Sequence, residues 1–426
     1  MLPNLTPDTA LAERLFDELR ARSFDGVGIT REAYGPGERM AHALVREAAE
    51  ALGLECRADP IGNLYMTLPG ADRAAPQVML GSHLDSVPQG GNYDGAAGVL
   101  AGLAAVAGLK RAGFTPGRDI TVMAIRAEEA GAWFPTSFPG SRGALGLLRP
   151  EELALKRQDP GGRSLAEHMR EEGFDPGFVE RGGKVLGPHN VSAFLEVHIE
   201  QGPVLDSEGI PVGIVTGIPG SRRLRNARVL GEYNHSGATP RKYRRDAAIA
   251  LADLAVALDE AWCRLEAQGH RLVVTFCTMG TTAEAGFTKI AGEARFQLDV
   301  RSVNLHSVDA VYEVFYDKVA EIEARRGVRF ELGDEGGSRA SLMNPEMQEG
   351  LQRAAEALGI PFHAMASGGG HDAVAFASAG VPAGMLFVRN QNGSHNPHEA
   401  MRIEDFAKAC AVAQRWAAER AQGTER

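Results

Sequence analysis

The sequence predicts an α/β protein in which a mainly parallel-sheet, three-layer domain is split by an inserted α+β sandwich domain. Short apolar runs alternate with helical patterns at both ends of the chain, which is typical of layered α/β domains. The middle instead joins alternating strands to two long amphipathic helices. The 426 residues also exceed the ~250–300 at which one core stops growing. We therefore expect residues 1–212 and 331–426 to form the α/β domain and residues 213–330 the insertion.

The first part of the α/β domain contains one clear helix between strands. The segment 95–113 is apolar almost all round, which indicates a buried helix. Strands are expected at 75–83, 119–127 and 192–198, because each is a short apolar run that ends in polar residues. Residues 159–187 are rich in Gly, Pro and charge, so we expect a surface loop with one short helix there.

The insertion is expected to contain four strands and two helices. The strands fall at 210–215, 222–231, 270–279 and 291–303, and the helices at 244–267 and 307–325. After residue 333 the alternation returns, with helices at 345–358, 371–379 and 403–422 and strands at 361–366 and 383–387. This return is the reason for assigning both ends of the chain to one domain.

Composition excludes several classes of protein. The net charge of −10 and the pI of about 5.7 argue against a nucleic-acid partner, since phosphate binding requires clustered positive charge. No run of ~18 apolar residues predicts a membrane span. The N-terminus lacks the basic and apolar regions of a signal peptide. Four widely spaced cysteines fit a reducing compartment and exclude a cysteine-ligated zinc site, so we expect a cytoplasmic protein.

Polar clusters follow the predicted strands. His83 and Asp85 lie two residues apart, so an extended strand directs both to one face, where a carboxylate can fix the ring tautomer of a metal-binding histidine. Isolated pairs of this kind more often cap a loop. Asp94 precedes the predicted helix at 95–113 and is therefore either its N-cap or a metal ligand.

Further clusters close the later strands. Glu128 and Glu129 follow a buried strand and point in different directions, so one can bind a metal while the other acts as general base. Surface acidic pairs are common, but here the preceding strand is strongly apolar. His198 ends another strand, and His395 lies in a polar loop after the last strand.

Together these residues predict a metal site. Imidazole and carboxylate without a nearby thiolate suit Zn²⁺, Mn²⁺ or Co²⁺. In an open α/β sheet, ligands gather beyond the carboxyl ends of the strands, where all the clusters fall. Three histidines and two carboxylates can hold two ions about 3.5–4 Å apart if one carboxylate bridges them.

The chain resembles the M20 metallopeptidase superfamily over residues 25–410. The motifs that carry the resemblance occur in the family's order: GSHLDSV, NYDGAAGV, the glutamate pair, EVHIEQGPVL, HSGATP, DVRS, SGGGHDA and GSHNPHE. More narrowly, they are similar to those of the amidase/hydantoinase/carbamoylase branch, which includes N-carbamoyl-L-amino acid hydrolases, β-ureidopropionases and allantoate amidohydrolases. The resemblance implies a metal-dependent hydrolase of C–N bonds in linear amides. Residues 1–212 and 331–426 are then its catalytic domain, and the insertion is the lid and dimerisation domain of a homodimer.

The resemblance also implies the metal ligands. His83, Asp94 and His198 hold one ion, and Asp94, Glu129 and His395 hold the other, so that Asp94 bridges the two ions. Zinc is the expected ion, with manganese or cobalt as alternatives, because the same nitrogen and oxygen ligands accept all three.

The remaining roles follow from the same resemblance. Glu128 is the general base, which takes a proton from water activated between the ions, and Asp85 orients a metal-binding histidine. His235 reaches the partner subunit's site to stabilise the oxyanion. Gln201 and Arg301 contact the substrate, Arg301 through its planar fork, although a surface strand arginine is the plain alternative for Arg301.

Four departures from the family's pattern concern the substrate. Trp133 follows the glutamate pair in Ala-Gly-Ala-Trp-Phe-Pro, where the branch has Gly-Ser-Arg-Phe, and so changes the shape of the pocket. Thr288 replaces a substrate-binding Asn and cannot supply both an amide donor and a carbonyl acceptor. Arg241 adds a positive charge near the lid, and Arg389-Asn390 replaces Pro-Ser before the last metal histidine.

Three functions remain open. The first is hydrolysis of an N-carbamoyl-L-amino acid or a related linear ureide. The second keeps the chemistry but acts on an N-acyl-amino acid or another small carboxylated amide. The third is an inactive metal-binding or ligand-binding protein, which is disfavoured because every metal ligand and the base are present.

Overall fold

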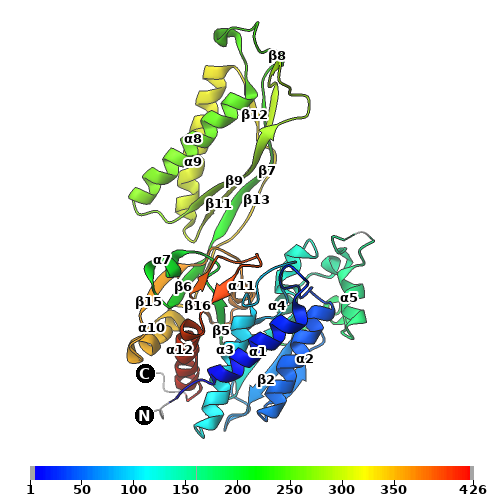
Figure 1. The fold of residues 1–426 in the computed structure, drawn as a ribbon, viewed down its shortest axis with the longest axis vertical. Coiled ribbons are helices and arrows are strands. Elements are labelled where there is room, and N and C mark those ends of the chain that lie inside the picture. The colour runs from blue at the N-terminus through cyan, green and yellow to red at the C-terminus, as the bar shows by residue number, and fades with distance from the viewer. Residues whose placement is uncertain (1–4, 160, 423–426) are drawn as a thin grey trace. The chain divides into compact units, whose positions relative to one another are not determined.

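The computed structural model describes residues 5–159 and 161–422, which divide into two compact units (Figure 1). The first unit takes the chain up to Thr216 and again from Met343 onward, and the second spans Gly217–Leu342. The predicted insertion at 213–330 therefore begins four residues later and ends twelve residues later in the structure. The later end arises because residues 329–331 and 335–338 still pair with a strand of the second unit.

The larger sheet contains nine strands within the described part of the chain, in the order β1-β2-β4-β3-β5-β16-β6-β14, with β15 paired to β6 beside that path. Its parallel pairs lie at the centre, between β4, β3, β5 and β16, and the pairs β1–β2, β2–β4, β16–β6 and β6–β14 are antiparallel. The strands are β1 (Glu55–Ala58), β2 (Leu64–Leu68), β3 (Gln77–His83), β4 (Ile120–Ile125), β5 (Val191–Ile199), β6 (Val212–Ile218), β14 (Ser341–Leu342), β15 (Phe362–Ala366) and β16 (Ala383–Val388).

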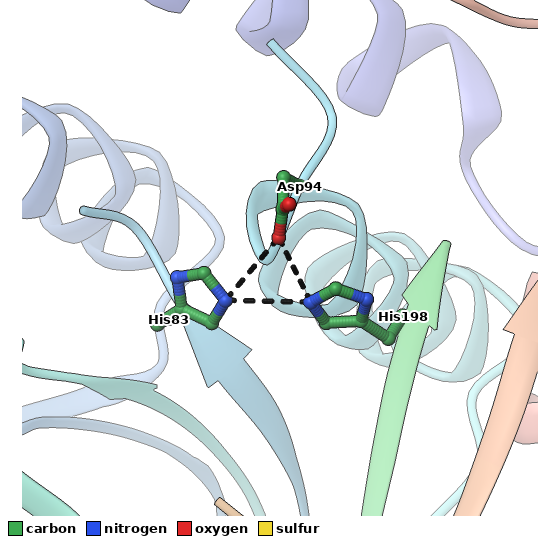
Figure 2. Close-up of side chains that lie close together, drawn as sticks. All are labelled: His83, Asp94 and His198. Carbon is green, nitrogen blue, oxygen red and sulfur yellow. Dashed lines mark hydrogen bonds and ion pairs between the residues drawn. The ribbon is translucent and has the colours of Figure 1, made fainter. Parts of the chain in front are cut away.

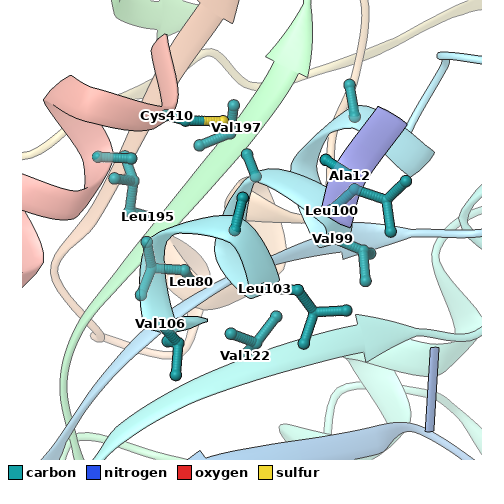
Figure 3. Packing of buried hydrophobic residues seen from close by; sticks show 14 of the residues in the cluster. Ala12, Leu80, Val99, Leu100, Leu103, Val106, Val122, Leu195, Val197 and Cys410 are labelled. Atoms are coloured by element: carbon teal, nitrogen blue, oxygen red, sulfur yellow. The ribbon is translucent and has the colours of Figure 1, made fainter. Parts of the chain in front are cut away.

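The helix α3 (Ala96–Arg111) forms the centre of the first unit's core, and every residue from Ala96 to Leu109 is buried, as its all-apolar sequence predicts. Figure 3 shows it packed among β3, β4 and β5 together with residues of α1 (Thr9–Ser23) and α12 (Ile403–Ala421). At Gly98 a Cβ atom would lie 2.0 Å from the carbonyl oxygen of Val197, so this glycine lets α3 approach β5 closely. The close approach brings the start of α3 next to the ends of β3 and β5.

Further helices of the first unit complete its layers. The longer ones are α2 (Pro36–Ala51) and α10 (Pro345–Ala357), with short helices α4 (Pro139–Ala144), α7 (Val204–Glu208), α11 (Ala373–Ser378), η1 (Glu128–Ala132) and η2 (Pro150–Ala154). The region 159–187 holds two short helices where one was predicted, α5 (Leu165–Glu171) and α6 (Gly177–Glu180). The N-terminal helices α1 and α2 and the strands β1 and β2 had no sequence prediction. None of the described helices is both long and apolar enough for a membrane span.

The second unit is an antiparallel sheet with two helices. Its strand order is β12-β7-β11-β9, and β13 also pairs with β7. The strands are β7 (Gly220–Leu230), β9 (Val273–Thr281), β11 (Glu293–Ser302), β12 (Arg329–Glu331) and β13 (Glu335–Ser338), and the helices are α8 (Ala247–Ala267) and α9 (Leu305–Arg326). A separate two-stranded ribbon joins β8 (Asn234–His235) to β10 (Lys289–Ile290).

One strand prediction for the insertion was wrong. The segment 210–215 was expected in the sandwich, but β6 pairs with β16 in the larger sheet, and β12 and β13 join β7 instead. The apolar pattern of residues 210–215 identified a strand correctly. An apolar pattern shows that a strand is buried but not which strand it pairs with. It therefore did not show to which sheet residues 210–215 belong.

Candidate metal centre

Five predicted ligands of the first unit lie together in two groups of three. The ligand atoms of His83, Asp94 and His198 lie within 4.8 Å of one another, and so do those of Asp94, Glu129 and His395. Asp94 belongs to both groups. Figure 2 shows the first group, in which His83 ends β3, His198 lies near the end of β5, and Asp94 enters from the segment before α3.

The first group presents unshared electron pairs to one point. His83 Nδ1 lies 3.1 Å from the carbonyl oxygen of Asp85, and His198 Nδ1 lies 2.8 Å from that of Ile199. A carbonyl oxygen only accepts, so each Nδ1 carries a hydrogen and each Nε2 faces inward. The two Nε2 atoms are 3.3 Å apart, and they lie 3.6 and 3.0 Å from Asp94 Oδ1.

This arrangement fits a cation. Asp94 Oδ1 is buried and accepts no hydrogen bond from the described residues, so it faces only the ring nitrogens of His83 and His198. Burial opposes the charged form of His83, yet the carboxylates of Glu128, Asp85 and Asp94 raise its pKa well above the usual range. The same negative field attracts a metal ion, and neutral imidazole with carboxylate is a donor set for zinc, manganese or cobalt.

The second group is more open. His395 Nε2 lies 2.8 Å from Glu129 Oε1 and 3.4 Å from Asp94 Oδ2. Hydrogen bonds to Asp94 and Glu129 raise the pKa of His395 to about 10. The His395 side chain is half exposed and its backbone has a φ of 58°, an unusual conformation for a residue with a side chain. A site with one open side suits a reaction in which a substrate must enter.

Asp94 does not cap α3. The N-cap of α3 is Gly95, with φ 64°, and Gly95 makes no side-chain cap. A Cβ atom at Gly95 would lie 2.3 Å from the His83 ring, so only glycine fits between this histidine and the helix. The Asp94 carboxylate is therefore directed into the centre, where its Oδ2 accepts hydrogen bonds from Gln201 Nε2 at 2.8 Å and from Ser394 Oγ.

Asp85 links the first histidine to the glutamate pair. It lies in the loop after β3 and not in the strand as predicted, with Oδ1 3.4 Å from His83 Nδ1. Its two carboxylate oxygens accept the backbone N–H groups of Glu128 at 3.1 Å and Glu129 at 3.0 Å. One side chain thus orients the His83 ring and the turn that carries the proposed base.

Glu128 lies beside the first group of three residues. Its carboxylate is buried, with Oε2 3.8 Å from His83 Nε2. Burial, together with the charge of Glu129, raises the pKa of Glu128 well above its usual range, although the His83 charge opposes this. A carboxylate with a raised proton affinity is suited to act as a general base. The preceding residue, Ala127, has a φ of 58°, so the chain turns sharply into η1.

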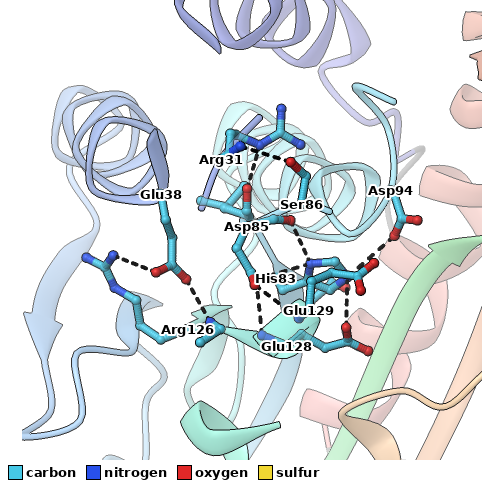
Figure 4. A network of polar contacts seen from close by, with 12 residues as sticks. Arg31, Glu38, His83, Asp85, Ser86, Asp94, Arg126, Glu128 and Glu129 are labelled. Atoms are coloured by element: carbon cyan, nitrogen blue, oxygen red, sulfur yellow. Dashed lines mark hydrogen bonds and ion pairs between the residues drawn. The ribbon is translucent and has the colours of Figure 1, made fainter. Parts of the chain in front are cut away.

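A buried ion pair holds that turn (Figure 4). Glu38 Oε1 accepts the backbone N–H of Ala127 at 2.7 Å, and Oε2 accepts Arg126 Nη1 at 3.1 Å and the backbone N–H of Tyr34 at 2.7 Å. Burial raises the pKa of Glu38 to about 7, with Arg126 acting in the opposite direction. The contact fixes the residue directly before Glu128.

Two other glutamates of the EVHIEQ segment have structural contacts. Glu196 is buried and accepts hydrogen bonds from Ser82 Oγ and from the backbone N–H of Ala373. Glu200 accepts the backbone N–H groups of Val204 and Leu205, at the start of α7. Neither belongs to a metal-binding group in the described structure.

The predicted substrate residues of the first unit also have protein contacts. Gln201 donates to Asp94 Oδ2, as above, and its backbone N–H donates to Asn390 Oδ1 at 3.0 Å. Trp133 is half-buried, and its indole N–H donates to the carbonyl oxygen of Ser86 at 2.9 Å. Arg157 lies over the Trp133 ring at 4.5 Å.

The remaining predicted residues lie in the second unit. His235 is exposed and pairs with Lys289 in the β8–β10 ribbon, and the carbonyl oxygen of Thr288 accepts the backbone N–H of Ser236 at 2.9 Å. Arg301 lies near the end of β11 that is farther from the β8–β10 ribbon, and its Nη2 donates to Asp299 Oδ2 at 2.8 Å. His235 and Thr288 are therefore neighbours, whereas Arg301 is distant from both along the sheet.

Several residues around the centre were missed by sequence reasoning. Glu399 Oε1 accepts the backbone N–H groups of Tyr93 and Asp94, and Ser394 Oγ lies 2.6 Å from Glu399 Oε2. Ser394 and Glu399 belong to GSHNPHE and so carried a signal. Glu38 lies in the polar amphipathic helix α2, whose sequence carried no signal of a role at the centre.

The chain is similar to known amidohydrolases over most of its length. The sequence profile described as "Peptidase family M20/M25/M40" matches residues 79–419. An N-carbamoyl-L-amino acid amidohydrolase of Geobacillus stearothermophilus is 36% identical, with 90% of this chain and 91% of that protein covered. An allantoate amidohydrolase of Escherichia coli (strain K12) is 34% identical, with 89% and 90% covered. The crystal structure of a hydantoinase/carbamoylase family amidase from Burkholderia ambifaria superimposes with a TM-score of 0.87 at 32% identity, with 99% of both chains covered.

Proposed function

Because the chain belongs to peptidase family M20/M25/M40, we propose that it is a dinuclear metal-dependent amidohydrolase that cleaves the C–N bond of an N-carbamoyl-L-amino acid or a related linear ureide. The observation that carries the proposal is the pair of three-residue groups that share Asp94, with the buried carboxylate of Glu128 3.8 Å from His83. Relatives named for N-carbamoyl-L-amino acids and for allantoate support this substrate class.

The residues fit two divalent ions. His83, His198 and Asp94 Oδ1 would hold one, and Asp94 Oδ2, Glu129 and His395 the other, with zinc as the expected ion and manganese or cobalt as alternatives. When bound, the ions supply Lewis acidity and bring the pKa of bound water toward neutrality. Asp94 is the one ligand whose two oxygens face different groups, so it is suited to bridge.

The chain's own residues then move the proton and orient the site. Glu128 takes a proton from the attacking water and gives it to the leaving nitrogen. Asp85 keeps His83 in the tautomer with the hydrogen on Nδ1, because it offers only acceptors to that nitrogen. For an N-carbamoyl substrate the products are the amino acid and carbamate, and carbamate decomposes to ammonia and carbon dioxide.

We propose that the substrate's other contacts come from two subunits of a homodimer. The strand β11 runs about 26 Å from Glu293, which lies next to the β8–β10 ribbon, to Arg301, at ~3.3 Å per residue. One small substrate cannot contact both His235 and Arg301 of the same copy. The long edge strand β9, with Val273 and Met279 exposed, and exposed Ile249 and Val256 on α8 offer an apolar surface for a second copy.

A second substrate class is favoured by one observation. Thr288, beside His235, carries a single hydroxyl, which does not reproduce the donor and acceptor of an amide side chain. Recognition of the terminal amide of a ureide is then weaker at this position. This supports an N-acyl-amino acid, or another small carboxylated amide, as the alternative substrate.

A substrate panel tests the proposal. The metal-loaded protein is assayed for ammonia release from N-carbamoyl-amino acids, allantoate and ureidoglycolate, and for amine release from N-acetyl- and N-formyl-amino acids. We expect turnover of ureides, lost in Glu128→Gln and retained in Glu47→Gln, an exposed glutamate on α2. Activity confined to N-acyl compounds would select the alternative, and no activity on either class would defeat both.

A further inference from the structure

Arg31, in the segment between α1 and α2, is a fully buried arginine beside the metal centre. None of its surface is exposed, and its three hydrogen-bond acceptors are uncharged oxygens of Leu84, Asn92 and Ser23. Its Nη2 is buried and makes no hydrogen bond to the described residues. A buried cation held only by neutral groups is costly, so its presence requires a reason.

One side of Arg31 forms hydrogen bonds with the segment that follows His83 (Figure 4). Arg31 Nε donates to the carbonyl oxygen of Leu84 at 2.6 Å, and its backbone N–H donates to Ser86 Oγ at 2.9 Å. The backbone N–H of Ser86 in turn donates to the carbonyl oxygen of Arg31 at 2.9 Å. Asp85, which lies between Leu84 and Ser86, is thus fixed from both sides.

The other arm of Arg31 holds the segment before Asp94. Arg31 Nη1 lies 3.3 Å from Asn92 Oδ1, and Asn92 Nδ2 donates to the carbonyl oxygen of Phe16 at 2.9 Å. Asn92 is two residues from Asp94. A planar guanidinium donates in several fixed directions at once, and a lysine ammonium at the same place cannot span both acceptors in the same geometry.

The field of the centre stabilises the charge of Arg31. Burial lowers the pKa of Arg31 to about 10, and the carboxylates of Glu399, Asp85 and Asp94 act in the opposite direction. Arg31 therefore stays charged at neutral pH. The acidic centre and the buried cation stabilise each other through space, without a direct ion pair.

We propose that Arg31 is a positioning residue of the metal centre, which sets the separation of His83 from Asp94 by holding the two segments that carry them. The inference rests on the proposed metal-dependent function. It concerns ligand geometry, so it can be tested by metal binding without any substrate.

The test measures metal affinity in Arg31→Lys, Arg31→Met and Ser23→Ala. Metal-free proteins are titrated with Zn²⁺ in competition with a chromophoric chelator, and their fold is checked by circular dichroism. We expect both Arg31 variants to raise the Kd of at least one ion about 10–100-fold, the usual range for residues that orient metal ligands. Ser23→Ala removes a contact of Arg31 that touches neither segment, so its Kd should stay within about twofold of the unmodified protein.

Two outcomes would overturn the proposal. Wild-type affinity in Arg31→Lys would show that charge alone suffices, and wild-type affinity in Arg31→Met would show that Arg31 is irrelevant to the centre. If neither variant folds, Asn92→Ala removes the acceptor at the other end of the bridge and should weaken binding by a similar factor. Where Arg31→Lys folds, the double variant Arg31→Lys/Asn92→Ala should be no weaker than either single variant, because both remove one link; additive effects, or an unaffected Asn92→Ala in either case, would refute the bridge.

Activity adds a second readout. If the proposed function holds, Arg31→Lys should lower kcat for the best ureide at least about 10-fold and leave KM within about twofold, because the substrate contacts are untouched. If no ureide is hydrolysed by the unmodified protein, the proposed function fails. The metal-binding result still decides the role of Arg31.

Discussion

The Nε2 atoms of His83 and His198 lie 3.3 Å apart, while each ring turns its Nδ1 toward a backbone carbonyl oxygen. Both rings thus point unshared electron pairs at the same space, which Asp94 Oδ1 also faces without a hydrogen bond. Without a metal ion, only a proton on one of the ring nitrogens can relieve the repulsion between these atoms, in line with the raised pKa of His83. The backbone contacts that fix both tautomers therefore hold the centre ready for a metal ion.

Removal of metal should destabilise the protein. A ligand that binds only the folded state stabilises it by about 2.7 kcal/mol at a free concentration of 100 Kd. We expect a chelator to lower the Tm, and Zn²⁺ or Mn²⁺ to restore it. His198→Ala should have a Tm that responds less to metal, because one of the two groups loses a ligand. Equal Tm values for metal-free and metal-loaded protein would contradict the assignment of the centre.

Glu128→Gln should separate catalysis from metal binding. The amide keeps the size of the side chain but cannot accept the proton of the attacking water, so kcat should fall about 10²–10⁴-fold. Metal content, measured by elemental analysis, should stay at the wild-type value because Glu128 is in neither ligand group. A variant that keeps full turnover would remove Glu128 as the base.

Mixed dimers test the shared active site. His235→Ala and Glu128→Ala should each be inactive, but refolding or co-expressing them together should restore activity. In a mixed dimer one site receives an intact Glu128 from one chain and an intact His235 from the other, so up to about one quarter of wild-type activity per total chain is expected. No recovery in mixed dimers verified by two affinity tags would argue that His235 does not act across the subunits.

Glu152 should make the fold sensitive to acid. Burial by itself raises the pKa of Glu152, but hydrogen bonds from Arg142 and Thr136 outweigh it and lower that pKa to about 2. A lowered folded-state pKa contributes stability that is complete above the ordinary value near 4.5 and is lost as pH falls toward 2. Urea unfolding of metal-free protein should show Glu152→Gln to be less stable by roughly 1–3 kcal/mol at pH 6, with a smaller difference at pH 3.

The neighbouring Glu151 provides the control for this pH effect. Its side chain is largely exposed and pairs with an equally exposed Arg149, so Glu151→Gln should change stability by less than about 1 kcal/mol at either pH. A Glu152→Gln effect that is the same at pH 3 and pH 6 would show that the ion pair with Arg142 does not carry it.

The sequence predicted that His83 and His198 lie close together because each lies at or near the end of a strand with a strong apolar pattern. His83 and His198 close buried strands, and the carboxyl ends of neighbouring parallel strands meet at one edge of a sheet. The apolar segment 95–113 also predicted α3 to within two residues at each end. Where burial determines an element, the pattern is sufficient to find it.

Other features depend on contacts between distant segments and had no local signal. The sequence left open whether Asp94 is the N-cap of α3 or a metal ligand. In the structure the N-cap is Gly95, whose missing Cβ makes room for the His83 ring. Arg31 contacts Leu84 and Asn92, more than fifty positions away. The sheet of β6 and the late end of the second unit likewise depend on strand partners, which periodicity does not specify.

Arg301 should contribute recognition of the substrate's carboxylate. Its guanidinium is held by Asp299, at 3.0 Å from Nε and 2.8 Å from Nη2. A bidentate contact to a carboxylate uses the planar fork, which lysine lacks. Arg301→Lys should therefore lower kcat/KM for an N-carbamoyl-amino acid about 10–100-fold, a loss of roughly 1.4–2.8 kcal/mol of transition-state stabilisation.

A substrate without a carboxylate distinguishes this role from a general effect on the fold. The matched compound is the N-carbamoyl derivative of the corresponding amine, which keeps the ureido group and lacks only the carboxylate. If Arg301 binds the carboxylate, the slow turnover of this compound should be the same in the wild type and in Arg301→Lys, because neither can make the contact. An equal loss on both compounds would instead assign Arg301 to the structure of β11, as a surface strand arginine.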